Sequence, residues 1–235
     1  MSSILNNVGS IFAQRNLAQA QKGLNQTINR LSTGMRITKA SDDAAGLQIS
    51  NNLRADIKIL NQGRRNAMEG VGRIAIADGV LEEATNLLTR AATLAEQAAS
   101  GTTTAAGRTA LNQEYTQIKA ALDDLSANTK FDGTAIFGGD TSIVAEAQSI
   151  TISTSSFASV ANLSLTAAGF TDAGTSVTEL GLIETAIGTI SAQRGRLGAT
   201  EQRLNTVINS LGITAENVTA AESQIRDADI ATEVV

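Results

Sequence analysis

One helical pattern persists from Ala44 to Ala99 and constrains the fold more than any other feature of the sequence. Apolar residues recur there with a heptad-like step, apart from a gap at Arg64 and a slip near Ala77. The gap and the slip favour bundle-like packing over a strict coiled coil. At ~1.5 Å per residue the helix would be roughly 80 Å long, so the pattern predicts a rod. The expected seam consists of Leu53, Ile57, Leu60, Ala67, Val71, Ile74, Val80, Ala84, Leu87, Ala91, Leu94 and Ala98.

Three other stretches carry the same period and can supply partner helices. Residues 4–31 show an amphipathic helical pattern, and residues 108–128 follow a short loop rich in Thr, which predicts an antiparallel return. The period resumes near residue 177 and continues to the end of the sequence. Gly195 and Gly198 weaken this last helix, and we expect a neighbouring helix to approach closely there.

Residues 32–44 break the helical period with a polar segment. Gly34 fits a helix stop, and Ser41 or Asp42 is the expected N-cap of the long helix that follows. The sequence therefore predicts a bent connector between the first two helices.

Small and hydroxyl residues crowd between positions 129 and 178, where apolar and polar residues alternate at 149–153 and 162–165. This pattern predicts a small β-rich region that is too short to fold alone. Aromatic residues make up only 3% of the chain, so Ala, Leu, Ile and Val must pack in thin seams. The predicted fold class is mainly α: a long antiparallel helical bundle or rod with coiled-coil-like packing and a small β-hairpin region.

The sequence offers little to catalysis. It contains no His and no Cys, which removes most acid–base, nucleophilic and zinc arrangements. Acidic pairs such as Glu82–Glu83 are typical of helix caps or solvated faces. Residues 70–75 match a loose G-x-G-x-x-A pattern, but they lie inside a helical period with no preceding strand. We predict no enzyme activity, and no catalytic, cofactor-binding or metal-binding residue.

Charge and hydropathy also exclude some partners. Residues 1–65 hold nine Lys and Arg against three Asp and Glu, whereas the remainder hold nine against twenty. The basic residues are spaced singly and only Phe12 could stack on a base, so nucleic acid is not expected. No run of about 18 apolar residues is present, and no membrane insertion is expected. The first residues lack the pattern of a cleaved signal peptide, so any export would use another route.

Four segments of the sequence resemble bacterial flagellins, in the order and at the places typical of that family. They are LSTGMRITKASDDAAGLQISNNLRADI (31–57), GRRNAMEGVGRIAIADGVLEE (63–83), TKFDGTAIF (129–137) and AESQIRDADIATEV (221–234). The resemblance covers everything outside roughly 140–176. It implies a secreted structural subunit of the flagellar filament that self-assembles by helix packing into a helical tube for swimming motility.

The resemblance also implies a division of the chain into four regions. The expected regions are an N-terminal inner-tube helix with its spoke connector at 1–44, a long helix and return helix of the outer-tube rod at 45–130, a short β-rich variable segment at 131–176, and a C-terminal rod helix at 177–235. Flagellins continue through a final apolar helix that packs on the first one and offers a surface to the export chaperone. Because this sequence ends at Val235, we expect it to be truncated relative to the family, without that helix or that surface.

Three sets of residues acquire roles from the resemblance. Inner-tube packing is expected from Ile4, Leu5, Val8, Ile11, Phe12, Leu17, Leu24, Ile28 and Leu31. A spoke joint is expected at Lys39, Asp42 and Asp43. Recognition by the flagellin-sensing Toll-like receptor is expected from Arg90, Leu94, Gln97 and Glu114, with Leu94 as a core residue being the alternative.

The resemblance implies further partners and leaves two alternatives open. The partners are other flagellin subunits, the flagellar export apparatus and chaperone, and the filament cap and hook-junction proteins. One alternative is a hook–filament junction protein. The other is a non-enzymatic helical scaffold or binding module, in which the amides of residues 1–31 would exchange slowly in the monomer.

Overall fold

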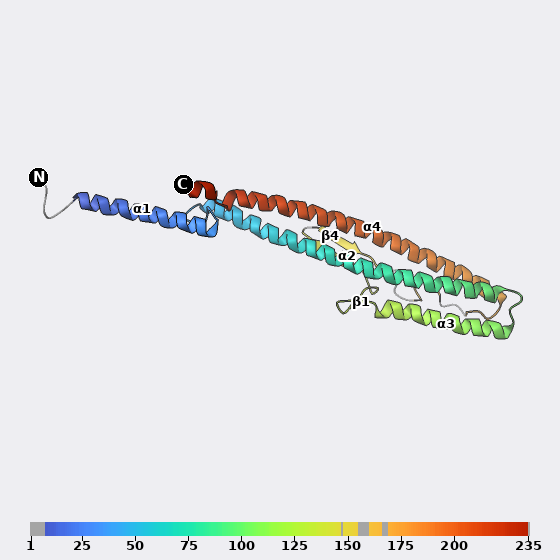
Figure 1. Cartoon of the computed structure of the whole chain (residues 1–235). Helices are drawn as coiled ribbons and strands as arrows, with labels where there is room; N and C mark the ends of the chain where they lie inside the picture. Colours follow the sequence, from blue (N-terminus) through green and yellow to red (C-terminus); the bar gives the residue numbers. More distant parts are fainter. Residues whose placement is uncertain (1–7, 147, 155–159, 166–168, 235) are drawn as a thin grey trace. The chain divides into compact units, whose positions relative to one another are not determined.

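The structure is a computed structural model that describes residues 8–146, 148–154, 160–165 and 169–234 (Figure 1). Long helices dominate it, and the predicted mainly α fold with a small β-hairpin region is confirmed. The chain divides into two compact units, one of Met1–Asn61 with Gly212–Val235 and one of Gln62–Leu211. The elements are α1 (Val8–Thr33), α2 (Ala44–Ala99), α3 (Ala105–Asn128), β1 (Lys130–Phe131), β2 (Thr134–Ala135), β3 (Thr141–Ala145), β4 (Gln148–Ile152), α4 (Ala173–Arg226) and α5 (Ile230–Glu233).

Within the Gln62–Leu211 unit, α2, α3 and α4 lie side by side, with α3 and α4 antiparallel to α2 (Figure 1). Their shared core is rich in Ala, Leu and Ile. The sequence pattern places Val80 and Leu87 in the seam, yet both are only partly buried, while Leu81 and Leu88 are fully buried. The reason is that α2 packs against α3 and α4 at once, so its buried stripe is wider than a single heptad seam. 

The turn between α2 and α3 is closed by polar groups. The Thr104 side chain accepts a hydrogen bond from the Gly107 N–H at 3.2 Å, so α3 begins at Ala105, earlier than predicted. The Arg108 guanidinium donates to the carbonyls of Ala98 (2.8 Å) and Ser100 (3.2 Å) at the end of α2. These bonds satisfy carbonyls that have no partner within their own helix.

An aromatic pair fills the core near the start of α4. Tyr115 of α3 is fully buried and stacks on Phe170, with ring centroids 4.8 Å apart. Its hydroxyl donates to the Glu179 carboxylate at 2.6 Å. Burial and then this hydrogen bond raise the pKa of Tyr115 above its ordinary value, so the phenol stays protonated and remains a donor.

Two antiparallel hairpins connect α3 to α4. The β1–β2 hairpin turns at Asp132 and Gly133, both with positive φ, as a two-residue hairpin turn requires. In the second hairpin Ile143 of β3 pairs with Ile150 of β4, so the expectation of a strand at 149–153 is confirmed. The expected strand at 162–165 is wrong. Those residues form a turn, in which the Leu165 N–H donates to the Val160 carbonyl, and the buried Leu163 and Leu165 produce the alternation.

Small residues on α2 let the β3–β4 hairpin lie against it. A Cβ atom at Gly63 would meet the backbone nitrogen of Glu146 at 2.9 Å, and one at Gly70 would meet Ile143 at 3.1 Å. The Asn66 amide, between them in sequence, donates to the Val144 carbonyl at 2.9 Å. Gly63 and Gly70 therefore provide the close approach that we expected at two other glycines.

The expectation for Gly195 and Gly198 is wrong. Both lie on an exposed face of α4, and a Cβ atom at either would meet nothing within 4 Å. The helical pattern expected to run unbroken from residue 177 also ends at Arg226, and α5 begins only at Ile230. The interruption occurs because residues 227 and 228 turn to pair with the connector before α2, while Asp229 caps α5.

The matched substitutions Gly63→Ala and Gly72→Ala should change stability in opposite directions. Alanine is favoured over glycine in a helix by about 0.5–1 kcal/mol, and a Cβ atom at Gly72 meets nothing within 4 Å, so Gly72→Ala should stabilise. At Gly63 the new Cβ presses on main chain that cannot move alone, so we expect a net loss of about 1 kcal/mol. Urea unfolding of both variants measures this, and equal stabilisation by both would show that the hairpin does not sit tightly on α2.

Candidate assembly surface

Helix α1 exposes its whole apolar face. None of its residues is buried, and the predicted packing residues Val8, Ile11, Phe12, Leu17, Leu24 and Ile28 are each more than half exposed. Leu31 is partly buried, and Ile4 and Leu5 lie outside the described residues. Large apolar side chains gathered on one exposed helix are typical of a surface that binds another protein. Most of the stability of such a helix comes from packing of its apolar side chains, and Gly23 weakens it further.

The end of α1 is defined by a sharp stop. Gly34 adopts a positive φ of 68°, and its N–H donates to the Arg30 carbonyl at 2.7 Å. Glycine reaches this left-handed conformation at little cost, so the helix can end here and the chain can change direction. The helix stop predicted at this position is confirmed.

The connector after Gly34 pairs with the segment that follows α4. Met35 and Asp227 form an antiparallel bridge, flanked by hydrogen bonds from the Arg36 N–H to the Arg226 carbonyl (2.7 Å) and from the Ala228 N–H to the Gly34 carbonyl (2.9 Å). The Arg36 guanidinium adds a bond to the Ile225 carbonyl at 2.7 Å. Two extended pieces far apart in sequence thus form a short paired connector.

The three residues expected at the spoke joint, Lys39, Asp42 and Asp43, have different roles in the structure. The Asp42 carboxylate accepts bonds from the Thr38 hydroxyl (2.9 Å), the Lys39 N–H (3.0 Å) and the Thr38 N–H (3.2 Å), which fixes the turn. The Asp43 carboxylate accepts from the Gly46 N–H at 2.9 Å, so Asp43 caps α2, and the expectation of Ser41 or Asp42 as the cap is wrong. Lys39 contributes its backbone, and its residue is exposed.

The four residues expected at a receptor surface do not all face solvent. Arg90 and Glu114 are exposed and form an ion pair at 2.7 Å between α2 and α3. Gln97 is also exposed. Leu94 is 1% exposed and belongs to the core, because its position on α2 faces α3 and α4. The structure therefore brings three of the four to the surface, and recognition by a receptor stays a prediction.

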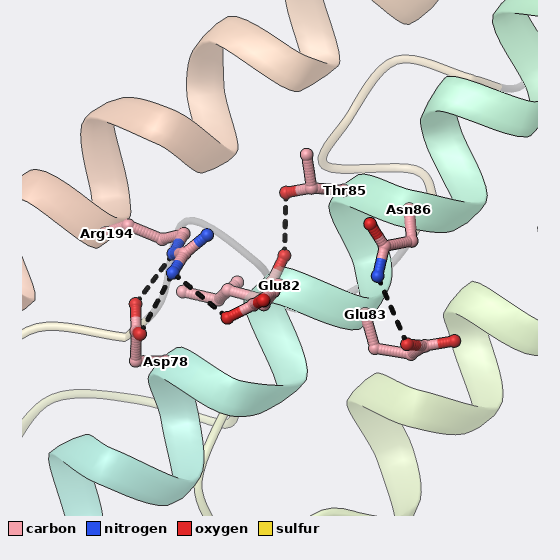
Figure 2. A network of polar contacts seen from close by, with 7 residues as sticks. Asp78, Glu82, Glu83, Thr85, Asn86 and Arg194 are labelled. Carbon is pink, nitrogen blue, oxygen red and sulfur yellow. Dashed lines mark hydrogen bonds and ion pairs between the residues drawn. The ribbon is translucent and has the colours of Figure 1, made fainter.

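A second polar link joins α2 to α4 and was not predicted. Figure 2 shows Arg194 reaching from α4 to two carboxylates on α2. Its guanidinium donates to both oxygens of Asp78, at 2.7 and 3.1 Å, and lies 3.4 Å from the Glu82 carboxylate. The hydrogen bond to Asp78 raises the pKa of Arg194. The spacing of Asp78 and Glu82 by four residues puts both on one helix face, which was the available signal.

The described residues hold no group of three or more His, Cys, Asp and Glu placed to bind a metal ion. In the same part of the chain, no helix has both the length and the apolar character needed to span a membrane. The arrangement can present apolar and charged faces to another protein, and its polar groups serve caps and ion pairs.

Comparison with known proteins decides the family. A profile of the bacterial flagellin N-terminal helical region matches residues 4–142, and one of the C-terminal helical region matches residues 180–235. This chain belongs to the bacterial flagellin family. Flagellin FlaB2 of Treponema pallidum is 31% identical over 253 residues, covering 99% of this chain and 88% of that relative.

Other flagellins match over a shorter length. Polar flagellin F of Vibrio parahaemolyticus is 41% identical and B-type flagellin of Pseudomonas aeruginosa is 43% identical, each over 133 residues and 57% of this chain. The matched region spans only 35% and 27% of those two relatives. The crystal structure of Bacillus cereus flagellin superposes with a TM-score of 0.56 at 29% identity, covering 67% of this chain and 94% of that one. The flagellin fold is therefore shared.

The pKa of Asp42 provides a test of the joint in this flagellin. The Thr38 hydroxyl, followed by the backbone N–H groups of Lys39 and Thr38, holds the pKa of Asp42 below its ordinary value of 3.8. Because the folded-state pKa is lowered, the stability contributed by the turn is present above the ordinary value and is lost as pH falls through the folded-state value. Thr38→Val should raise the carboxyl midpoint measured by NMR toward 3.8. Thr116→Val, whose hydroxyl donates only to the Asn112 carbonyl within α3, should leave it unchanged. A midpoint insensitive to Thr38→Val would contradict this assignment.

Double-mutant cycles should rank the two interhelical ion pairs. The side chains of Arg194 and Asp78 are 34% and 41% exposed, against 59% and 44% for Arg90 and Glu114. A bidentate, partly shielded pair couples more strongly, so we expect about 1 kcal/mol for Arg194→Met with Asp78→Asn. The cycle of Arg90→Met with Glu114→Gln should give ~0.5 kcal/mol or less. Guanidinium unfolding gives both values, and the reverse order would refute the ranking.

Proposed function

We propose that this flagellin is a non-enzymatic structural subunit of the bacterial flagellar filament, which self-assembles by helix packing into a helical tube for swimming motility. The proposal rests on α1, a helix with an apolar stripe and no buried residue. In a filament, other copies of the same chain would cover these exposed apolar side chains. Membership of the flagellin family supports the same reading.

The proposed mechanism couples the ordering of α1 to assembly. An isolated amphipathic helix gains too little from its own hydrogen bonds to be stable, and burial of its apolar face supplies the remainder. A helical tube follows when each copy uses one surface to bind a different surface of the next, and the rotation does not close into a ring. We assign the inner-tube contacts to residues 8–31 and the outer contacts to α2, α3 and α4.

Location and further partners are part of the same proposal. A filament subunit lies outside the cell, and we infer export through the flagellar export apparatus without a cleaved signal peptide. Filament cap and hook-junction proteins would contact its ends, and an export chaperone would keep the exposed stripe from associating early. Arg90, Gln97 and Glu114 are the surface residues that we propose for a Toll-like receptor.

The single-copy alternative, a helical scaffold, predicts a different behaviour for α1. A scaffold would cover the stripe within the chain, whereas all six side chains from Val8 to Ile28 in the stripe are more than half exposed. Amide exchange of residues 8–31 should therefore be fast in the monomer and slow in filaments. Slow exchange in the monomer would favour the scaffold.

The charge substitutions Leu24→Glu and Gln19→Glu should separate assembly from folding. Leu24 is one of the exposed apolar residues of α1, and Gln19 is an exposed polar residue of the same helix. Losing one buried leucine costs about 1.5–3 kcal/mol, so Leu24→Glu should raise the critical concentration for polymerisation roughly tenfold or more. Gln19→Glu should change it little.

Sedimentation and electron microscopy of seeded polymerisation measure this difference, and unfolding of the Gln62–Leu211 unit should be the same in both variants. The proposal fails if the unmodified chain adds to no flagellin seed, or if the two variants polymerise alike.

A further inference from the structure

A cavity of about 310 Å³ lies in the Gln62–Leu211 unit between α2 and the loop that joins the two hairpins. The filament proposal gives it no role. Its lining combines a buried arginine with small residues, hydroxyl residues and one carboxylate: Arg73, Thr134, Ala135, Gly138, Gly139, Asp140 and Thr141.

Among the described residues, Arg73 has a single hydrogen-bond partner for its guanidinium. Its residue is 9% exposed, and its guanidinium makes one hydrogen bond, from Nη2 to the Ala135 carbonyl at 3.2 Å. Its Nε is buried with no hydrogen-bond partner, and no carboxylate of the described residues lies within ion-pair distance. A buried charge without a counter-ion is costly, because water no longer solvates it. The contrast is Arg194, which holds two carboxylates.

The loop at 138–140 adds unpaired donors to the same cavity. The backbone N–H groups of Gly138 and Asp140 make no hydrogen bond to the described part of the chain, while the Gly139 N–H closes the turn at 137–138. A Cβ atom at Gly139 would meet nothing within 4 Å, so this backbone is open to a ligand. Backbone N–H groups beside a guanidinium form the kind of site that binds tetrahedral anions. The Thr134 and Thr141 hydroxyls can donate as well.

We propose that this cavity binds a small tetrahedral oxyanion, of the phosphate or sulfate class, as the counter-ion of Arg73. The bound anion joins α2 to β2 and to the start of β3, and so strengthens the attachment of both hairpins to the helical core. The exposed Asp140 carboxylate lies at the same cavity and repels the anion, which sets a moderate affinity. The site is independent of filament assembly and forms within one chain.

Titration of the monomeric 235-residue chain with inorganic phosphate, at constant ionic strength held with sodium chloride, tests the site. We expect saturable binding by calorimetry and a saturable rise in Tm that chloride does not reproduce. Arg73→Met should weaken binding by about tenfold or more, as loss of a charged hydrogen-bonding partner predicts. The exposed Arg196→Met on α4 removes the same charge away from the cavity and should bind like the unmodified chain.

A second variant and a competition experiment separate anion binding from a general loss of structure. Arg73→Met also removes the bond to Ala135, so Asp140→Asn serves as a variant that leaves this bond intact and should bind phosphate a few-fold more tightly. Sulfate should compete with phosphate, whereas acetate, which is planar, should compete weakly.

Three results would overturn the proposal. They are stabilisation by phosphate no greater than by chloride at equal ionic strength, equal losses in Arg73→Met and Arg196→Met, or no tightening in Asp140→Asn. Each would leave Arg73 with a structural role only, as the hydrogen-bond donor to the Ala135 carbonyl. Because the experiment uses the monomer, its failure says nothing about polymerisation.

Discussion

The structure depends on burying small aliphatic side chains in thin seams between long helices. With so few aromatic residues, the chain cannot build a thick core, and Ala, Leu and Ile must supply the buried area. Small side chains allow helices to approach closely. The close contacts between helices supply dispersion energy that compensates for the small volume of each buried side chain. Tyr115, Phe137 and Phe170 are the buried aromatic exceptions, and the Tyr115–Phe170 pair fills the core where α3 meets the start of α4.

The two units use this principle to different extents. The Gln62–Leu211 unit has a contiguous core shared by three helices and the β3–β4 hairpin. The other unit includes α1, which buries none of its own residues. A helix whose apolar side chains are exposed gains stability when a partner covers them, so ordering of α1 and binding of a partner are thermodynamically coupled.

Several arginines fix how two segments are aligned with each other, which hydrophobic burial alone does not specify. Arg194 joins α4 to α2, Arg108 closes the end of α2, and Arg36 ties the connector to the segment after α4. A planar guanidinium can donate several bonds at fixed angles, so each such contact specifies register as well as proximity. Arg73 follows the same pattern with one carbonyl only, which is why its cavity stands out.

The sequence by itself determined the helices and the family. Apolar periodicity placed α2 at its observed bounds, and the helix stop at Gly34 is local, so neighbouring residues were sufficient to predict it. Only the tertiary structure decided which residues face which partner: the burial of Leu94, the close approach at Gly63 and the isolation of Arg73. The reason is that a helical period repeats every turn and leaves the register between helices open. Register is set by contacts between segments more than a hundred residues apart, such as Arg194 with Asp78.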